Sequence, residues 1–217
     1  MKKNLTELVF ILDKSGSMRG LEKDTIGGYN SMLERQRCAA GDCNITTVLF
    51  DDGYELLHDR ADIGTIGPMT EREYCAGGST ALLDAIGKTV HKIGTLQKNL
   101  PDDRRAEKVM FVIITDGEEN ASRQYSAARV KHMIGRQKER YGWEFIFLGA
   151  NIDAVGTAAK VGIKADRAVN YISDSKGTEL SFHMICKTVT SFRESGKVGC
   201  EYLDEIRKDK EERGERK

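Results

Sequence analysis

The stretch TELVFILDKSGSM, residues 6–18, places small oxygen-bearing side chains directly after an apolar run. Residues 8–12 are all apolar, which is typical of a strand that is covered on both faces of a parallel sheet. Asp13, Ser15 and Ser17 then follow at alternate positions. One carboxylate and two hydroxyls at the end of a strand suit Mg²⁺ or Mn²⁺ better than zinc or copper. Taken alone, this DxSxS pattern is equally compatible with a strand end whose side chains cap the next helix.

Two later stretches extend the pattern. Thr80 lies in GGSTALLDA, a glycine-rich turn that runs into a helix, and Asp116 lies in VMFVIITDGEEN, a second buried strand that ends in Asp-Gly. With these stretches the chain resembles the von Willebrand factor type A family, in the stand-alone form found in prokaryotes, over roughly residues 6–193. The metal-ion-dependent adhesion site of that family consists of DxSxS, a threonine in a later loop and an aspartate at a later strand end. The residues that match this motif in type, order and approximate spacing are Asp13, Ser15, Ser17, Thr80 and Asp116.

The periodicity of apolar residues predicts the elements that must position this motif. After the first strand, further strands are expected at residues 44–50, 54–58, 108–115, 143–148 and 167–171. Helices are expected at residues 20–38, 80–96, 126–140, 154–161 and 175 to about 195. The Gly27-Gly28 pair lowers the helix propensity of the first helix and is compatible with a close approach to the sheet.

Strands that alternate with helices after one hairpin predict an α/β fold with a doubly wound, mostly parallel sheet of six strands. The turn Asp51-Asp52-Gly53 predicts the hairpin, so one edge strand should be antiparallel, and helices should cover both faces. With the strand order 3-2-1-4-5-6, Asp13 and Asp116 should lie side by side at the carboxyl edge of the sheet. We expect one type A-like domain over residues 1–195. Residues 196–217 are expected to form a charged tail or helix extension, either a frayed solvated helix or a disordered tail.

Composition excludes several other classes. The 34 basic and 34 acidic residues give no basic surplus, so nucleic acid is not an expected partner. No apolar segment is long enough to span a bilayer, and the amino-terminal apolar run is too short for a signal peptide, so we expect a cytoplasmic protein. The five cysteines are scattered and odd in number, which favours reduced thiols. The four histidines are dispersed, without zinc-site spacing.

Two functions fit the motif. The resemblance implies a protein-binding module without catalytic residues, in which Mg²⁺ or Mn²⁺ keeps one coordination position open for an Asp or Glu of a partner protein. The alternative is a Mg²⁺-dependent phosphohydrolase of similar fold, in which Asp13 would be the nucleophile. Phosphohydrolases that resemble haloacid dehalogenases need a second acid two residues later, where this chain has Ser15, a poor acid or base near neutral pH. The GxSxG pattern of serine hydrolases is absent.

Overall fold

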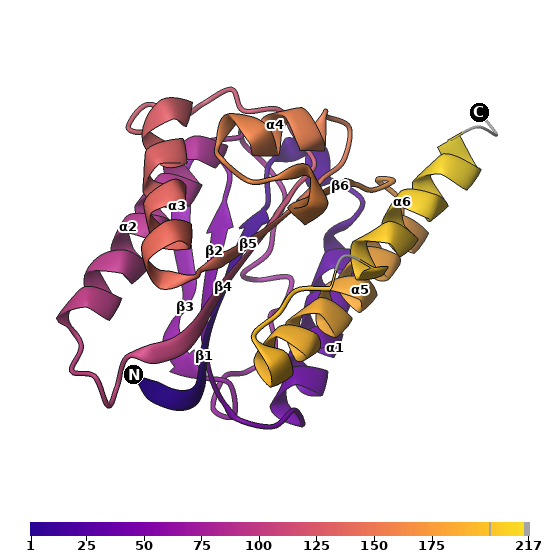
Figure 1. Cartoon of the computed structure of the whole chain (residues 1–217). Helices are drawn as coiled ribbons and strands as arrows, with labels where there is room; N and C mark the ends of the chain where they lie inside the picture. The colour runs from indigo at the N-terminus through magenta and orange to yellow at the C-terminus, as the bar shows by residue number, and fades with distance from the viewer. Residues whose placement is uncertain (200, 215–217) are drawn as a thin grey trace.

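The computed structural model describes residues 1–199 and 201–214, which form a sheet with helices on both faces (Figure 1). The strands are β1 (Lys2–Asp13), β2 (Asp42–Phe50), β3 (Tyr54–Asp62), β4 (Ala106–Thr115), β5 (Glu144–Gly149) and β6 (Ala168–Asn170). The α-helices are α1 (Glu22–Arg37), α2 (Leu82–Asn99), α3 (Ala127–Tyr141), α4 (Ala154–Lys160), α5 (Ser175–Ser195) and α6 (Glu201–Gly214). Two short 3-10 turns, Gly16–Met18 and Ala165–Arg167, precede α1 and β6.

The sheet has the strand order β3-β2-β1-β4-β5-β6. Strands β2 and β3 pair in antiparallel orientation, with Phe50 opposite Tyr54 across the turn, and every other neighbouring pair is parallel. The predicted doubly wound fold with one antiparallel edge strand is therefore confirmed. Strands β1 and β4 are neighbours, so their carboxyl ends lie at the topological switch point where ligands bind in such sheets.

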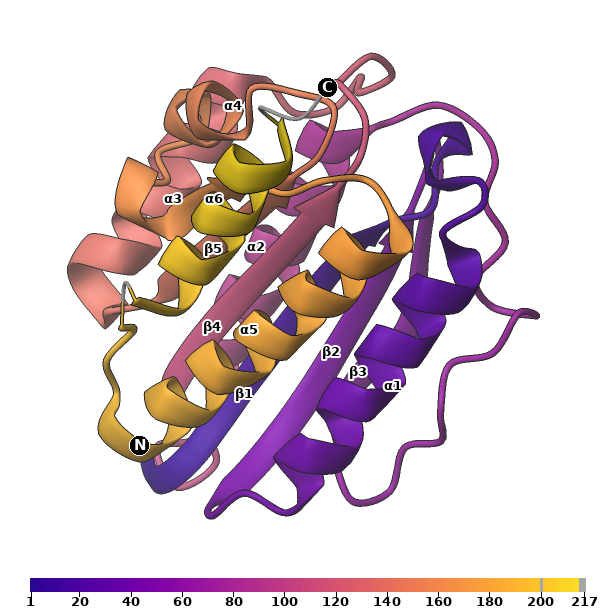
Figure 2. The same cartoon turned by 90° about the vertical axis from the view of Figure 1, so that its right-hand side faces the viewer.

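Each face of the sheet has its own core. Helices α1, α5 and α6 cover one face and α2, α3 and α4 the other (Figures 1 and 2). Strand β1 supplies both cores in alternation: Leu8 and Phe10 point to the first, Val9 and Ile11 to the second. This alternation explains the continuous apolar run, because a strand buried on both faces has no solvent-facing side.

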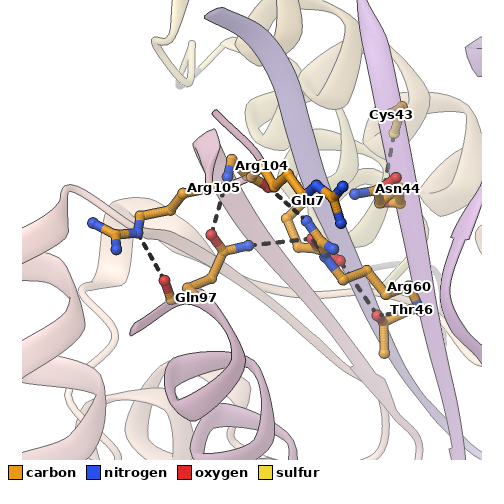
Figure 3. Close-up of polar contacts among 9 residues, drawn as sticks. Glu7, Cys43, Asn44, Thr46, Arg60, Gln97, Arg104 and Arg105 are labelled. Atoms are coloured by element: carbon orange, nitrogen blue, oxygen red, sulfur yellow. Dashed lines mark hydrogen bonds and ion pairs between the residues drawn. The ribbon is translucent and has the colours of Figure 1, made fainter. Parts of the chain in front are cut away.

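The carboxylate of Glu7 is buried within a cluster of polar contacts toward the amino ends of β2 and β4 (Figure 3). Glu7 on β1 is fully buried, and its carboxylate accepts hydrogen bonds from Arg60 Nε at 2.8 Å and Gln97 Nε2 at 3.2 Å. Arg60 has a left-handed φ of 50°, and its backbone N–H donates to Thr46 Oγ1 at an irregularity of the β2–β3 pairing. Strand β3 therefore continues past the predicted end at His58, because this contact restores the pairing after the irregularity.

The structure corrects the expectation for the carboxyl-terminal segment. Residues 201–214 form the ordered helix α6, which buries Leu203 and Ile206 against α5 and the sheet. Arg207 donates to the carbonyl oxygen of Ala168 at 2.9 Å, and Arg213 pairs with Asp174 at 2.8 Å. A helix extension was one of the forms expected for residues 196–217; what the structure corrects is that this helix is packed against α5 rather than frayed and solvated. Residues 200 and 215–217 lie outside the described part of the chain.

Two further sequence expectations concern thiols and membranes. Cys38, Cys43, Cys75 and Cys186 are free, and Cys200 lies outside the described residues. Over residues 1–199 and 201–214, the helices are too short or too polar for any of them to cross a bilayer.

Candidate metal centre

Three hydroxyl groups converge beside Gly117, which follows Asp116 at the end of β4. A Cβ atom built on Gly117 would lie 2.8 Å from Thr80 Oγ1, 3.1 Å from Ser17 Oγ and 3.6 Å from Ser15 Oγ. The Oγ atoms of Ser15 and Ser17 are themselves 3.0 Å apart. Residues that are far apart in the sequence therefore place three oxygen donors around one small space that the missing side chain of Gly117 leaves open.

Asp13 is fixed beside this space at the end of β1. Its Oδ1 accepts a hydrogen bond from the Ser15 backbone N–H at 2.7 Å, which shapes the loop that carries both serines. Its Oδ2 accepts from the Thr115 hydroxyl at 2.7 Å and from the Asp116 backbone N–H at 3.3 Å. The Tyr74 hydroxyl donates to the Asp13 carbonyl oxygen. The carboxylate is thus oriented by the loop that follows β1 and by the end of β4.

Asp116 lies beside Asp13, as the strand order predicts, but its carboxylate contacts residues from the far half of the sheet. Asn151, after β5, donates its side-chain amide to Oδ1, and Ser173, after β6, donates its hydroxyl to Oδ2 at 2.7 Å. Asn151 has a left-handed φ of 54°, a conformation that asparagine tolerates better than most residues. Four strand ends therefore contribute to one polar cluster.

Burial makes the two carboxylates costly to ionise. Burial raises the pKa of the Asp13 carboxyl, and the hydrogen bonds from Ser15, Thr115 and Asp116 act in the opposite direction. Burial also raises the pKa of Asp116; Ser173 and Asn151 oppose this, and the neighbouring charge of Asp13 adds to it. A divalent cation between the carboxylates and hydroxyls would offset both effects, because an opposite charge favours the ionised form.

The loop that carries Thr80 is held from two sides. The Thr80 N–H donates to Asn120 Oδ1 at 2.9 Å, and the Thr80 carbonyl oxygen accepts from the Asn120 N–H at 3.1 Å. The next residue, Ala81, donates its N–H to the Asp51 carbonyl oxygen at 2.7 Å. Glu119 caps α2 by accepting from the Leu83 N–H at 2.8 Å. These contacts place Thr80 against the loop that follows β4.

The cluster opens to the surface on one side. Asp13, Ser15, Thr80 and Asp116 are 1% to 3% exposed, whereas Ser17 is exposed. A cation held by the three hydroxyls would therefore be reached from the side of Ser17. Access from one side suits a site that keeps a coordination position for an external ligand.

The donor set decides which chemistry fits. All five motif residues supply oxygen atoms, which suit hard divalent cations. Across residues 1–199 and 201–214, no three His, Cys, Asp or Glu side chains lie close enough to hold a metal ion together, so the hydroxyls would have to complete the shell. The position two residues after Asp13 is occupied by Ser15, whose hydroxyl contacts Ser17 rather than a general base.

Sequence reasoning missed four residues of this cluster. Thr115, Asn120, Asn151 and Ser173 hold the motif residues in place through the hydrogen bonds described above. A usable signal was present for two of them. Asn151 and Ser173 are polar residues just after the last two strands, whose carboxyl ends meet the same edge of the sheet.

Solved structures show which class of fold this is. No protein-family model and no curated protein matches the sequence. Proximal thread matrix protein 1 of the mussel byssus, with a zinc-occupied MIDAS motif, superposes with a TM-score of 0.58 at 14% identity, over 85% of this chain and 46% of its own. The von Willebrand factor type A structure from Catenulispora acidiphila gives a TM-score of 0.53 at 16% identity, over 86% of this chain and 42% of its own.

Manganese-loaded TRAP protein of Plasmodium vivax gives a TM-score of 0.56 at 17% identity, over 82% of this chain and 72% of its own. The chain therefore has the von Willebrand factor type A fold. It spans less than half of the length of the first two of these structures. At these identities the likeness concerns the fold, so the role of the site has to be argued from this chain's own residues.

Proposed function

We propose that this chain is a metal-dependent protein-binding module that recognises an acidic residue of a partner protein. The observation that supports it is the convergence of the Ser15, Ser17 and Thr80 hydroxyls on the space beside Gly117, next to Asp13 and Asp116. The two similar structures that carry zinc and manganese have the same fold. The proposed cation is Mg²⁺ or Mn²⁺.

The roles of the residues follow from their contacts. Ser15, Ser17 and Thr80 would hold the cation through their hydroxyl oxygens, and Asp13 and Asp116 would supply the negative charge close to it. When bound, the cation supplies an exchangeable coordination position, which a carboxylate from outside can occupy. The exposed Ser17 marks the side from which that carboxylate arrives.

The loops around Ser17 are proposed to select the partner. They comprise residues 19–24, 70–79 and 118–123, and two of them are internally braced. Glu73 accepts from the Thr70 hydroxyl at 2.6 Å, and Glu119 accepts from the Ser122 N–H at 2.8 Å. A braced loop loses little conformational freedom on binding, which favours affinity.

Calorimetric titration with Mg²⁺ and Mn²⁺ tests the site, and thermal unfolding tests its energetic consequence. Metal at about one hundred times its dissociation constant should stabilise the protein by about 2.7 kcal/mol. Asp13→Asn should lose this metal response yet unfold at the same temperature as the metal-free wild type, or higher, because one buried charge is removed. No heat of binding at millimolar metal and no metal-dependent rise in melting temperature would contradict the proposal.

Capture from native extract tests the partner. A protein held by the wild-type chain should be released by EDTA and should not bind Thr80→Ala. Changing one Asp or Glu of that protein to its amide should have the same effect. The phosphohydrolase alternative predicts instead Mg²⁺-dependent turnover of a generic phosphomonoester that is lost in Asp13→Asn. Such turnover without an EDTA-sensitive partner would overturn the binding assignment.

A further inference from the structure

The charges of this neutral chain are unevenly distributed over its two faces. Helices α2 and α3 carry eight Lys and Arg residues and two acidic residues. Helices α1, α5 and α6, on the opposite face of the sheet, carry ten basic and eleven acidic residues. The net charge of zero therefore conceals a cationic face. It is formed by α2 and α3, which lie next to each other on one side of the sheet (Figure 1).

A groove runs along this face near the carboxyl ends of the two helices. It consists of two adjoining cavities of about 240 and 280 Å³, which share Gly94, Lys98, Gln137 and Tyr141. A Cβ atom on Gly94 would lie 2.8 Å from Gln137 Nε2, so the end of the Gln137 side chain lies over this glycine between the cavities. We call this feature the α2–α3 groove.

The floor of the α2–α3 groove is apolar and firmly held. Trp143 lines it, is 5% exposed, and stacks on Phe111 with ring centroids 5.5 Å apart. Val109 lines the same cavity, and Val90 and Met133 line the other. Tyr141 stands at the rim and is 54% exposed. An apolar side chain of a ligand could therefore bury itself here without displacing the core.

The rim of the groove is cationic and largely uncompensated. Lys98, Arg136 and Arg140 are exposed, and none of them forms an ion pair within the part of the chain that the structure describes. Among the described residues that line the groove, Glu107 is the one acid, and it already accepts from the Asn4 N–H at 2.8 Å. The cation on the first turn of α3 differs, because Arg129 lies over the Tyr125 ring, 4.4 Å from its centroid.

We propose that the α2–α3 groove binds an acidic segment of a partner protein, with one apolar side chain of that segment seated over Trp143. Charge complementarity selects the acidic residues, and the apolar floor selects the anchor. A nucleic-acid backbone would use the cations but leave the floor unfilled. Membrane insertion requires an apolar surface, and the large apolar side chains exposed in the described chain are only Met1, Tyr141 and Val155.

The groove is separate from the candidate metal centre. It lies near Ala106 and Trp143, at the amino ends of β4 and β5, whereas Asp116 follows the carboxyl end of β4. The ten residues of β4 separate the two sites by roughly 30 Å, at about 3.3 Å per residue. Both surfaces are therefore accessible at the same time, and binding in the groove does not depend on a metal.

Fluorescence polarisation with a defined probe tests this inference in the full chain. The probe is a fluorescein-labelled peptide with Asp and Glu residues on both sides of a central Leu-Phe pair, measured in EDTA at low and high salt. It should bind, bind more weakly at high salt, and outcompete the same peptide with Asn and Gln in place of the acids. It should also bind more tightly than a single-stranded oligonucleotide of similar charge.

Matched variants locate the binding. Lys98→Glu combined with Arg136→Glu should lower the affinity for the peptide about tenfold or more. Lys187→Glu combined with Lys208→Glu makes the same change in charge at exposed positions of α5 and α6 and should leave binding unchanged. Tyr141→Ser, which removes an exposed ring and no core contact, should weaken the anchored peptide but not a peptide with Ser in place of Leu-Phe.

Several outcomes would overturn the inference. These are equal binding by the two double variants, equal affinity for the amide peptide, tighter binding of the oligonucleotide, and absence of peptide binding in EDTA. Circular dichroism of each variant shows whether it is folded, and the Tyr141→Ser comparison decides the question if the Lys98 and Arg136 double variant unfolds. Because the assay contains EDTA, its result is independent of the proposed metal-dependent function.

Discussion

The hydroxyl of Thr115 donates a hydrogen bond to Asp13 Oδ2 at 2.7 Å, and these two residues are the last of β4 and β1. The same Thr115 oxygen lies 3.4 Å from the Gly117 N–H, so one side chain connects the Asp13 carboxylate to the loop that leaves room for the three hydroxyls. The contact exists because β1 and β4 are neighbours in the sheet. It links the order of the strands directly to the geometry of the candidate metal centre.

Thr115→Val should therefore weaken the metal site without changing the shape of the core. Valine keeps the volume but leaves Asp13 Oδ2 with the Asp116 N–H alone, at 3.3 Å. Residues that hold a metal ligand in place typically contribute 10- to 100-fold to affinity, so calorimetry should show a loss of about that size for Mn²⁺. Thr89→Val is the control, because Thr89 is equally buried but donates to Ala85 within α2. Equal Mn²⁺ affinity in both variants would exclude this role of Thr115.

Gly117→Ala should fill the space in which the hydroxyls meet. Its Cβ would stand 2.8 Å from Thr80 Oγ1 and 3.1 Å from Ser17 Oγ, so these side chains would have to turn away. We expect calorimetry to detect no Mn²⁺ binding while the variant stays folded. Gly135→Ala in α3 is the control, because nothing lies within 4 Å of its added methyl group. It should stabilise the helix by about 1 kcal/mol and bind metal normally. Undiminished Mn²⁺ binding by Gly117→Ala would place the cation elsewhere.

The residues of the motif were easier to predict from the sequence than the residues that hold them in place through hydrogen bonds. Ser15, Ser17 and Thr80 are recognisable from their local pattern, and two buried strands that end in Asp predict that Asp13 and Asp116 are close. The positions of Asn151 and Ser173 after the last two strands place them at the same edge of the sheet. Their contact with Asp116 depends on the pairing registers of β4 with β5 and of β5 with β6, for which the sequence has no local signal.

Long-range packing explains the other differences between prediction and structure. In the sequence of α6, Leu203 and Ile206 stand among many charged residues, so the segment was expected to be solvated. These two apolar residues are three positions apart and form the buried side of the helix. The partner of Glu7 could not be predicted from the sequence either. Arg60 lies on β3 and reaches Glu7 on β1 across the intervening strand β2, so their ion pair depends on the order of the strands.

The Glu7–Arg60 pair should contribute far more stability than an exposed pair on the same strand. Arg60→Ala leaves the fully buried Glu7 carboxylate without its cation, which should cost about 3–5 kcal/mol in the free energy of unfolding. Lys92→Ala removes the partner of Asp59 in a pair whose side chains are 31% and 50% exposed. That change should cost less than about 1 kcal/mol. Urea denaturation of the two variants measures the difference. Similar midpoints would show that the Glu7 carboxylate is stabilised sufficiently by Gln97 Nε2 at 3.2 Å and by the Thr46 hydroxyl at 3.5 Å.

The adjacent glycines of α1 should respond in opposite ways to the same substitution. The Gly27-Gly28 pair suggested a close approach of α1 to the sheet, but the close approach is to α5. A Cβ on Gly28 would lie 2.5 Å from Phe182 Cδ2 and 2.9 Å from Phe182 Cβ, whereas Gly27 has nothing within 4 Å. Phe182 is 3% exposed and belongs to the core between α1, α5 and the sheet. Rotating its ring would not relieve the contact with its Cβ, so α5 itself would have to shift away from α1.

Gly28→Ala should therefore destabilise the protein by about 1–3 kcal/mol through overpacking, despite the higher helix propensity of alanine. Gly27→Ala gains that propensity without a clash and should stabilise by up to about 1 kcal/mol. Thermal and urea unfolding of the two single variants measure both changes against the same wild type. If both stabilise, α1 and α5 can separate at small cost. If both destabilise, the pair is needed for its backbone conformation rather than for contact with Phe182.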